Sequence, residues 1–146
     1  MLIRKAVETD VPLIHKLQQS WFEEGNVYGF APESKKQIEA ALDSYLVAEI
    51  GQRVVGFISS SVRISEGTAV IPAGESYLEI ENLYVLPEFR NQGVGSSLTA
   101  RQLSEAKALG AKYALVYSAA REIRHILDFY ERHNFKSWYV QMFQKL

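Results

Sequence analysis

A short run near the middle of the chain, Arg90-Asn91-Gln92-Gly93-Val94-Gly95, places an arginine and two glycines where a helix is predicted to begin. Backbone N–H groups in the first turn of a helix have no intrahelical acceptor, and the helix dipole adds partial positive charge there. Because glycine has no Cβ atom, an anion such as a phosphate can approach the backbone closely. The run lacks the third glycine of the dinucleotide fingerprint and the Gly-Lys-[Ser/Thr] of the P-loop. Taken alone, it is consistent with another kind of anion site or with an ordinary tight turn.

The strand that precedes this run contains a slip in its alternation. Leu78 and Ile80 share one parity, whereas the apolar residues after Asn82, which are Leu83 and Val85, occupy the other. Successive side chains of a strand point to opposite faces, so a fixed apolar face requires a fixed parity. The change of parity therefore predicts one extra residue in the ladder, a β-bulge.

Length and composition set wider bounds. A chain of 146 residues predicts one domain, residues 1–146, with a substantial core. The net charge of −1 gives no reason to expect a nucleic-acid or membrane partner. The absence of cysteine excludes disulfides and a cysteine nucleophile, and the histidines His15, His125 and His133 lack metal-ligand spacing, so no metal is predicted. No signal peptide or long apolar run is visible, which favours a cytoplasmic protein.

Hydrophobic periodicity predicts elements in the order β-α-α-β-β-β-α-β-α-β. Strands are expected at 2–7, 46–50, 54–64, 113–118 and 138–143, and the bulged strand is expected to begin at 77. Helices are expected at about 10–22, 33–44, 93–109 and 121–133. This order indicates an α/β fold, a mixed sheet flanked by helices. The unit from 77 to 118 should be a right-handed parallel crossover.

Three segments carry a resemblance to a known family. Val85-Leu86-Pro87-Glu88-Phe89-Arg90-Asn91-Gln92-Gly93-Val94-Gly95 resembles the acyl-CoA-binding motif of the GNAT N-acetyltransferase superfamily, whose core is [RQ]-x-x-G-x-[GA]. Ile3-Arg4-Lys5-Ala6 with Asp10-Val11-Pro12 resembles its opening strand and first helix. Phe129-Tyr130-Glu131-Arg132-His133-Asn134-Phe135 resembles its late F-Y-E-x-x-G-F segment, with asparagine in the glycine position. The segments occur in the family's order, and the resemblance covers nearly the whole chain.

The resemblance implies a GNAT fold in which the bulged strand and the strand after its helix splay apart to admit the pantetheine arm of acetyl-CoA. Backbone groups around Leu83, Tyr84 and Val85 would meet pantetheine and the reacting carbonyl. The pyrophosphate would lie against the backbone of Arg90, Asn91, Gln92, Gly93, Val94, Gly95 and Ser96. The Arg90 side chain would either contact a phosphate or serve as a surface residue that stabilises the turn.

The resemblance also implies direct attack of an amine on acetyl-CoA in a ternary complex. Glu81 and Glu79, beside the predicted bulge, are the candidates for the base, although glutamates at such positions also line solvated sheet faces. Tyr130 matches the family's general acid, which protonates the departing thiolate. Spacing alone favours a core tyrosine at this position, because Tyr130 shares a helical face with Ile126 and Leu127.

The acceptor implied by the resemblance is a primary amine of a small molecule or peptide, with a leaning toward small amines and polyamines because of the acidic residues. Acceptor recognition is expected in the aromatic-rich segment 21–30 and in 65–75. Ile123 and Ile126 replace an asparagine and an alanine that are common in the family. This departure leaves an alternative, an acyl-CoA-binding sensor or interaction module with little catalysis. The aromatic segment 138–143 suggests a homodimer.

Overall fold

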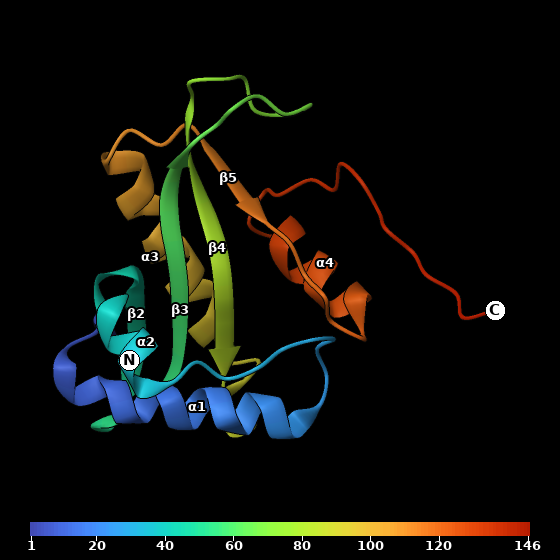
Figure 1. Ribbon diagram of the computed structural model, residues 1–146. Coiled ribbons are helices and arrows are strands. Elements are labelled where there is room, and N and C mark those ends of the chain that lie inside the picture. The colour runs from blue at the N-terminus through green and yellow to red at the C-terminus, as the bar shows by residue number, and fades with distance from the viewer.

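The computed structural model describes residues 1–146 and contains a five-stranded sheet in the order β1-β2-β3-β4-β5, with helices on both faces (Figure 1). The strands are β1 (Leu2–Lys5), β2 (Tyr45–Ile50), β3 (Arg53–Ile64), β4 (Ser76–Val85) and β5 (Tyr113–Val116). The helices are α1 (Val11–Glu24), α2 (Lys35–Ala40), α3 (Val94–Ala108) and α4 (Ile123–Glu131). Short 3₁₀ turns occupy Glu8–Asp10, Leu42–Ser44 and Pro87–Phe89. The predicted mixed α/β architecture is confirmed, with β4 and β5 as the parallel pair joined through α3.

Two hydrophobic clusters cover the two faces of the sheet, and alternate residues of the same strand serve each of them. In β2, Leu46 and Ala48 belong to the cluster on the α3 side, whereas Tyr45 and Val47 belong to the cluster under α1 and α2. All four side chains are buried. A strand that is covered on both faces reads as a continuous apolar run, which is how this segment appears in the sequence.

The predicted β-bulge is present in β4. Ser59 of β3 is paired with Asn82, and the next residue, Ser60, is paired with Ile80, so Glu81 is the extra residue. Leu78 and Ile80 before the bulge and Leu83 and Val85 after it pack into the same cluster on the α3 side. The inserted residue therefore keeps the apolar side chains on one face despite their change of parity.

The pairing of β4 with β5 ends where the bulge begins. The parallel register runs from Tyr77 opposite Tyr113 to Ile80 opposite Val116 and does not continue. The second half of β4 is therefore unpaired on that side, and the chain that follows β5 diverges toward α4 (Figure 1). A wedge opens between the two strands, with its narrow end at Ile80.

An ion-pair network around the buried Asp10 connects β1, the turn before α1 and β2. Asp10 is 2% exposed, and its carboxylate accepts from Arg4 Nη1 at 2.6 Å, from Arg4 Nη2 at 3.0 Å and from the Val7 N–H at 2.9 Å. Arg4 Nη2 also lies 3.0 Å from Glu49 Oε2 on β2. Burial by itself would raise the pKa of Asp10, but the hydrogen bonds from Arg4 and Val7 outweigh it and hold that pKa below its usual value.

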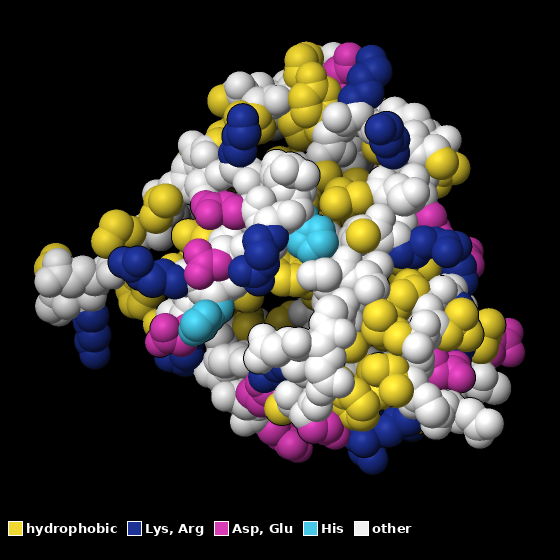
Figure 2. Space-filling view, turned by 180° about the vertical axis from the view of Figure 1, so that it is seen from behind, with side chains coloured by type: hydrophobic (Ala, Val, Ile, Leu, Met, Phe, Trp, Pro, Cys, Tyr) yellow, Lys and Arg dark blue, Asp and Glu magenta, His cyan; other side chains and the backbone are white.

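The predicted closing strand is wrong. Residues 136–146 contain no strand, and Val140, Met142 and Phe143 are about four-fifths exposed or more. Figure 2 shows this tail projecting from the body with hydrophobic side chains on its surface. Strand propensity is realised only when a neighbouring strand supplies pairing partners, and none of the five strands pairs with the tail.

Two smaller corrections concern helix faces. Leu109, the last residue of the helix predicted at about 93–109, lies beyond α3, which ends at Ala108, and its side chain is 76% exposed. On α4 only Tyr130 is buried, while Ile123 and Leu127 remain exposed. None of the helices has the length and apolar character needed to cross a membrane.

Candidate functional site

The loop between β4 and α3 presents a series of free backbone donors. Between Asn91 and Ser96 no backbone N–H group donates to a protein acceptor; the next N–H along the chain, that of Ser97, bonds to Gly93 O at 2.9 Å. These donors lie at the N-terminus of the 15-residue helix α3, where the helix dipole adds partial positive charge. The loop follows directly from the unpaired half of β4, so the donors lie beyond the open end of the wedge.

The two glycines of this loop serve different purposes. Gly93 has a φ of +81°, a left-handed conformation that favours glycine, and a Cβ atom built there would meet nothing within 4 Å. Gly95 has no such backbone requirement, but a Cβ atom there would lie 3.5 Å from the Phe129 ring of α4. The first glycine therefore shapes the loop and leaves it open to a ligand. The second lies against α4, at a distance where a Cβ atom would make an ordinary van der Waals contact with Phe129.

Arg90 is held by the protein on both sides. Its Nε donates to Val85 O at 2.9 Å, and its Nη2 donates to Glu24 Oε1 at 2.6 Å and Oε2 at 2.9 Å. Glu24 is the last residue of α1, and it also accepts from Tyr84 Oη at 2.7 Å. Burial and the Glu24 carboxylate together raise the pKa of Tyr84 well above its usual value, so the phenol stays protonated. Glu24 thus joins α1, the bulged strand and the donor loop.

The predicted base candidates, Glu79 and Glu81, are brought together by an arginine from β3. Arg63 Nε lies 3.0 Å from Glu79 Oε2, and Arg63 Nη2 lies 3.3 Å from Glu81 Oε1. The Ser61 hydroxyl also donates to Glu81 Oε1 at 2.8 Å. The exposed fractions of these side chains are 18% for Glu79, 33% for Glu81 and 51% for Arg63. The two carboxylates are therefore ion-paired in this state, through a guanidinium that remains open to solvent.

Tyr130 lies in the hydrophobic cluster on the α3 side and is 8% exposed. Its ring packs edge-on against Phe129 at 5.0 Å and Phe135 at 5.3 Å between ring centroids. Its hydroxyl forms no hydrogen bond within the chain. Burial raises the pKa of Tyr130 well above its usual value. The neighbouring Phe129 packs against Gly95, so α4 lies beside the donor loop.

The two segments predicted to recognise an acceptor lie at opposite ends of β4 (Figure 1). Segment 65–75 leads into the start of β4, and segment 21–30 lies beside the end of that strand. The Trp21 ring packs 4.2 Å from the Phe30 ring and 5.6 Å from the Tyr84 ring, between centroids. Tyr28 N donates to Ala119 O at 2.9 Å, so the loop after α1 reaches across to the segment before α4.

Sequence reasoning missed the partners of these residues. Glu24 is 66 positions from Arg90, and Arg63 is 18 positions from Glu81, so no local pattern connects them. The only sequence signal was Glu23-Glu24 at the end of the first helix, because negative charges at the C-terminus of a helix are unfavourable for the helix dipole. No cluster of His, Cys, Asp or Glu suited to a metal ion occurs in the chain.

Comparison with known proteins connects this geometry to a family. Residues 41–137 match the family model described as an acetyltransferase (GNAT) domain, which is more than half of the chain. No curated protein matches the chain in a sequence comparison.

Solved structures share the fold over the full length. A mutant of the BH1408 protein from Bacillus halodurans superposes with a TM-score of 0.81 at 16% identity, over 100% of this chain and 99% of that one. Aminoglycoside N-acetyltransferase AAC(6')-Iy, in complex with CoA, gives 0.74 at 18% identity, over 99% of each chain. The Rv2747 protein of Mycobacterium tuberculosis, in complex with CoA and NLQ, gives 0.73 at 21% identity, over 95% of this chain and 74% of that one. At sequence identities this low, the structural similarity shows a common fold and nothing beyond it.

Proposed function

Because the chain belongs to the GNAT family of acetyltransferases and is an acetyl-CoA-dependent N-acetyltransferase, we propose that it acetylates a primary amine of a small molecule or peptide by direct attack in a ternary complex. The observation that carries this proposal is the wedge in the sheet. The pairing of β4 stops at Ile80, the Glu81 bulge follows, and the wedge leads to the free N–H groups of the loop.

The residues present fit acetyl-CoA as the co-substrate. The backbone from Leu83 to Val85 has no strand partner on its β5 side, so the amides of a pantetheine arm can bond there as an added strand does. Val85 O already accepts from Arg90 Nε, which leaves the other groups for the ligand. The N–H groups from Asn91 through Gln92, Gly93, Val94 and Gly95 to Ser96 suit a diphosphate. The predicted contact of the Arg90 N–H with the pyrophosphate is wrong, because this N–H donates to Pro87 O at 3.2 Å. Arg90 supports the site by holding the loop, since its side chain is engaged by Glu24.

Glu81, or Glu79 beside it, would take the proton that the amine must lose before attack. A carboxylate with a reference pKa of about 4 is a weak base at neutral pH, so a bridging water or desolvation by the acceptor has to assist. Nitrogen then forms a bond to the acetyl carbon while the carbon–sulfur bond breaks. Tyr130 would give its proton to the departing sulfur; burial raises its pKa, so the phenol is protonated when the thiolate leaves.

Two measurements test the proposal. Coenzyme A should give saturable heat in titration calorimetry, and acetyl-CoA should release thiol with at least one member of a broad amine library. No heat and no thiol release would overturn the assignment. Saturable binding without turnover on any amine would favour the alternative, an acyl-CoA sensor or interaction module.

Substitution of the base candidates sharpens the test. With a responsive amine, Glu81→Gln should lower kcat by about 100-fold or more, within the usual range for a general base. Glu79→Gln shows by the same assay whether the neighbouring carboxylate carries the role instead. Glu105→Gln is the matched control, because it removes another ion-paired glutamate, on α3, and should leave kcat unchanged. Full activity in both Glu81→Gln and Glu79→Gln would remove the glutamates from the mechanism.

We also propose that the protein is cytoplasmic and that it forms a homodimer. The support for the homodimer is the tail, where Trp138, Tyr139, Val140 and Phe143 expose apolar surface. Contiguous exposed apolar residues commonly mark contacts between proteins, and twofold dimers are the commonest oligomers. On the face in Figure 2, charges of both signs are interspersed, so a nucleic-acid or membrane surface has no support there.

A further inference from the structure

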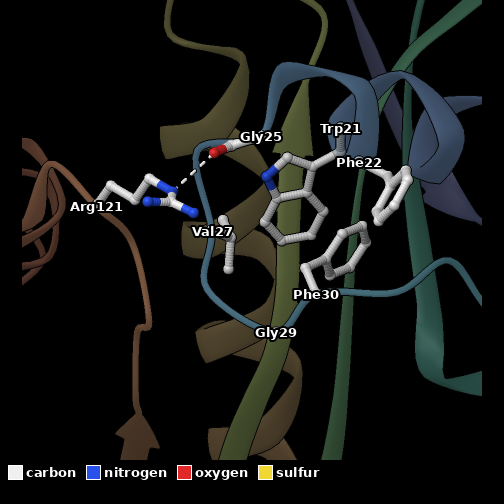
Figure 3. A pocket seen from close by; sticks show the side chains of 7 residues that line it. All are labelled: Trp21, Phe22, Gly25, Val27, Gly29, Phe30 and Arg121. Carbon is white, nitrogen blue, oxygen red and sulfur yellow. Dashed lines mark hydrogen bonds between the residues drawn. The ribbon is translucent and has the colours of Figure 1, made fainter. Parts of the chain in front are cut away.

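A cavity of about 380 Å³ lies between the end of α1 and the segment that precedes α4 (Figure 3). Its side-chain walls are Trp21, Phe22, Val27 and Phe30, and Gly25 and Gly29 add backbone. Its size is at the lower end of the range for small-molecule sites. The indole of Trp21 faces β4 in Figure 3 and stacks 5.6 Å from Tyr84, so the cavity adjoins the strand that carries the bulge.

The only charged residue that lines this cavity is Arg121. Its Nε donates to Gly25 O at 2.9 Å, and its guanidinium carbon lies 4.2 Å from the centre of the Tyr28 ring. Its backbone N–H donates to Asn26 O, also at 2.9 Å. The side chain is thus fixed by a carbonyl on one edge and by an aromatic face, and Figure 3 shows it reaching toward Gly25.

Arg121 differs from the other arginines near the site in having no carboxylate partner. Arg63 and Arg90 are both paired with glutamates, whereas neither terminal nitrogen of Arg121 has a hydrogen-bond partner in the chain. A guanidinium offers two parallel donors that match the oxygens of a carboxylate or phosphate. An oriented guanidinium with unused donors at the wall of an aromatic cavity is a preformed anion site.

Opposite charges therefore lie at two places along β4. Glu79 and Glu81 provide negative charge at the bulge, and Arg121 provides positive charge at the cavity beside the strand's far end. A polyamine would bring an ammonium group to Arg121, where two positive charges repel. An acceptor with an amine, an apolar or aromatic body and an anionic group would match all three surfaces.

From this arrangement we infer that the acceptor is an amine that also carries a carboxylate and a large apolar or aromatic group, as in a hydrophobic amino acid or a short peptide with such a residue. The inference rests on the proposed acetyl transfer for the role of the glutamates. Arg121 would bind the carboxylate, and Trp21 with Phe30 would contact the apolar group. The other source of an anion near Arg121 is a phosphate of coenzyme A, which the experiment must separate.

Binding can be followed without turnover because the chain has two tryptophans, Trp21 in the cavity and Trp138 in the exposed tail. In a Trp138→Phe background, L-phenylalanine should change the Trp21 fluorescence saturably in the presence of coenzyme A. L-Phenylalaninamide, which keeps the amine and the ring but lacks the carboxylate, should bind about 10-fold more weakly or worse, as expected for loss of a charge-assisted hydrogen bond. Spermidine should not compete.

The Arg121→Gln variant then identifies the residue. This variant should bind phenylalanine about 10-fold more weakly or worse, and its affinity for phenylalaninamide should be unchanged. Arg124→Gln, which removes an exposed arginine three residues further along the chain, is the matched control. It should leave the affinities for both ligands unchanged. An equal loss for both ligands would show that Arg121 only holds the loop, and equal affinity of wild-type protein for acid and amide would remove the carboxylate from recognition. Either result overturns the inference.

Calorimetry distinguishes the two anions. If Arg121 binds the acceptor, the Kd of coenzyme A should be the same in wild-type protein and Arg121→Gln. A weaker Kd for coenzyme A in the variant, with no such change for dephospho-coenzyme A, would assign Arg121 to a cofactor phosphate and overturn the inference. If phenylalanine binds as expected but no amine releases thiol, the proposed reaction fails while the binding site stands.

Discussion

Replacing Tyr130 with phenylalanine is expected to lower kcat by about 100-fold or more, the usual range for a lost general acid. The substitution keeps the ring, and therefore the edge-on packing against Phe129 and Phe135. It removes a hydroxyl that bonds to no other residue of the chain, so no buried partner is left unsatisfied. The stability of the fold should therefore change little while the leaving thiolate loses its proton donor.

Steady-state kinetics with the best amine of the library measure this effect, and calorimetry with coenzyme A should give an unchanged Kd. Tyr113→Phe is the matched control, since it removes the hydroxyl of a partly exposed tyrosine on β5. Wild-type turnover by Tyr130→Phe would leave Tyr130 as a core residue, the role that helical spacing alone favours. A large loss of thermal stability in the variant would instead show a structural need for the hydroxyl.

Replacing Asp10 with asparagine is expected to lower the free energy of unfolding by about 3 kcal/mol at neutral pH, the lower end for breaking a buried ion pair. A destabilisation at the lower end of this range is expected because Arg4 is partly exposed and keeps Glu49 as a partner. Urea unfolding of the two proteins gives the difference. Glu88→Gln, which breaks an exposed pair with Arg53, is the control and should cost less than about 1 kcal/mol.

The same residue gives a pH dependence with a defined sign. The folded-state pKa of Asp10 is depressed, so its contribution is fully present above the unfolded-state value of about 3.9 and is lost as the pH falls through the folded-state value. Wild-type protein should therefore lose stability more steeply than Asp10→Asn as the pH falls below about 4. Parallel stability curves for the two proteins in that range would contradict the assignment.

Features that depend on a few neighbouring residues could be predicted from the sequence. The parity change between Ile80 and Leu83 located the bulge to within one residue, because the pleat of a strand leaves no other way to keep both on one face. The hairpin at Gly51-Gln52 was also predictable, and both residues have positive φ angles in the structure. Asn134, which stands in the glycine position of the family's late segment, has a φ of +64° in the turn after α4.

Features that depend on distant partners could not be predicted. The aromatic segment from Trp138 to Phe143 has strong strand propensity, but no strand of the sheet pairs with it. The glutamates at the bulge were found, while the arginine that pairs with them was not, because it belongs to a neighbouring strand whose register no local pattern shows. The orientation of Arg121 depends in the same way on a carbonyl 96 positions earlier in the chain.

The contacts of Glu24 with Arg90 and Tyr84 have a consequence for the affinity of the two substrates. Its carboxylate holds Arg90 of the donor loop and Tyr84 of the bulged strand from the end of α1, next to the aromatic cavity. If occupation of the loop shifts Arg90, the end of α1 shifts with it, and each substrate alters the affinity of the other. Linkage makes that influence reciprocal and equal in size. Acetyl donor and acceptor would then bind cooperatively, with a coupling factor that should move toward one in Glu24→Gln.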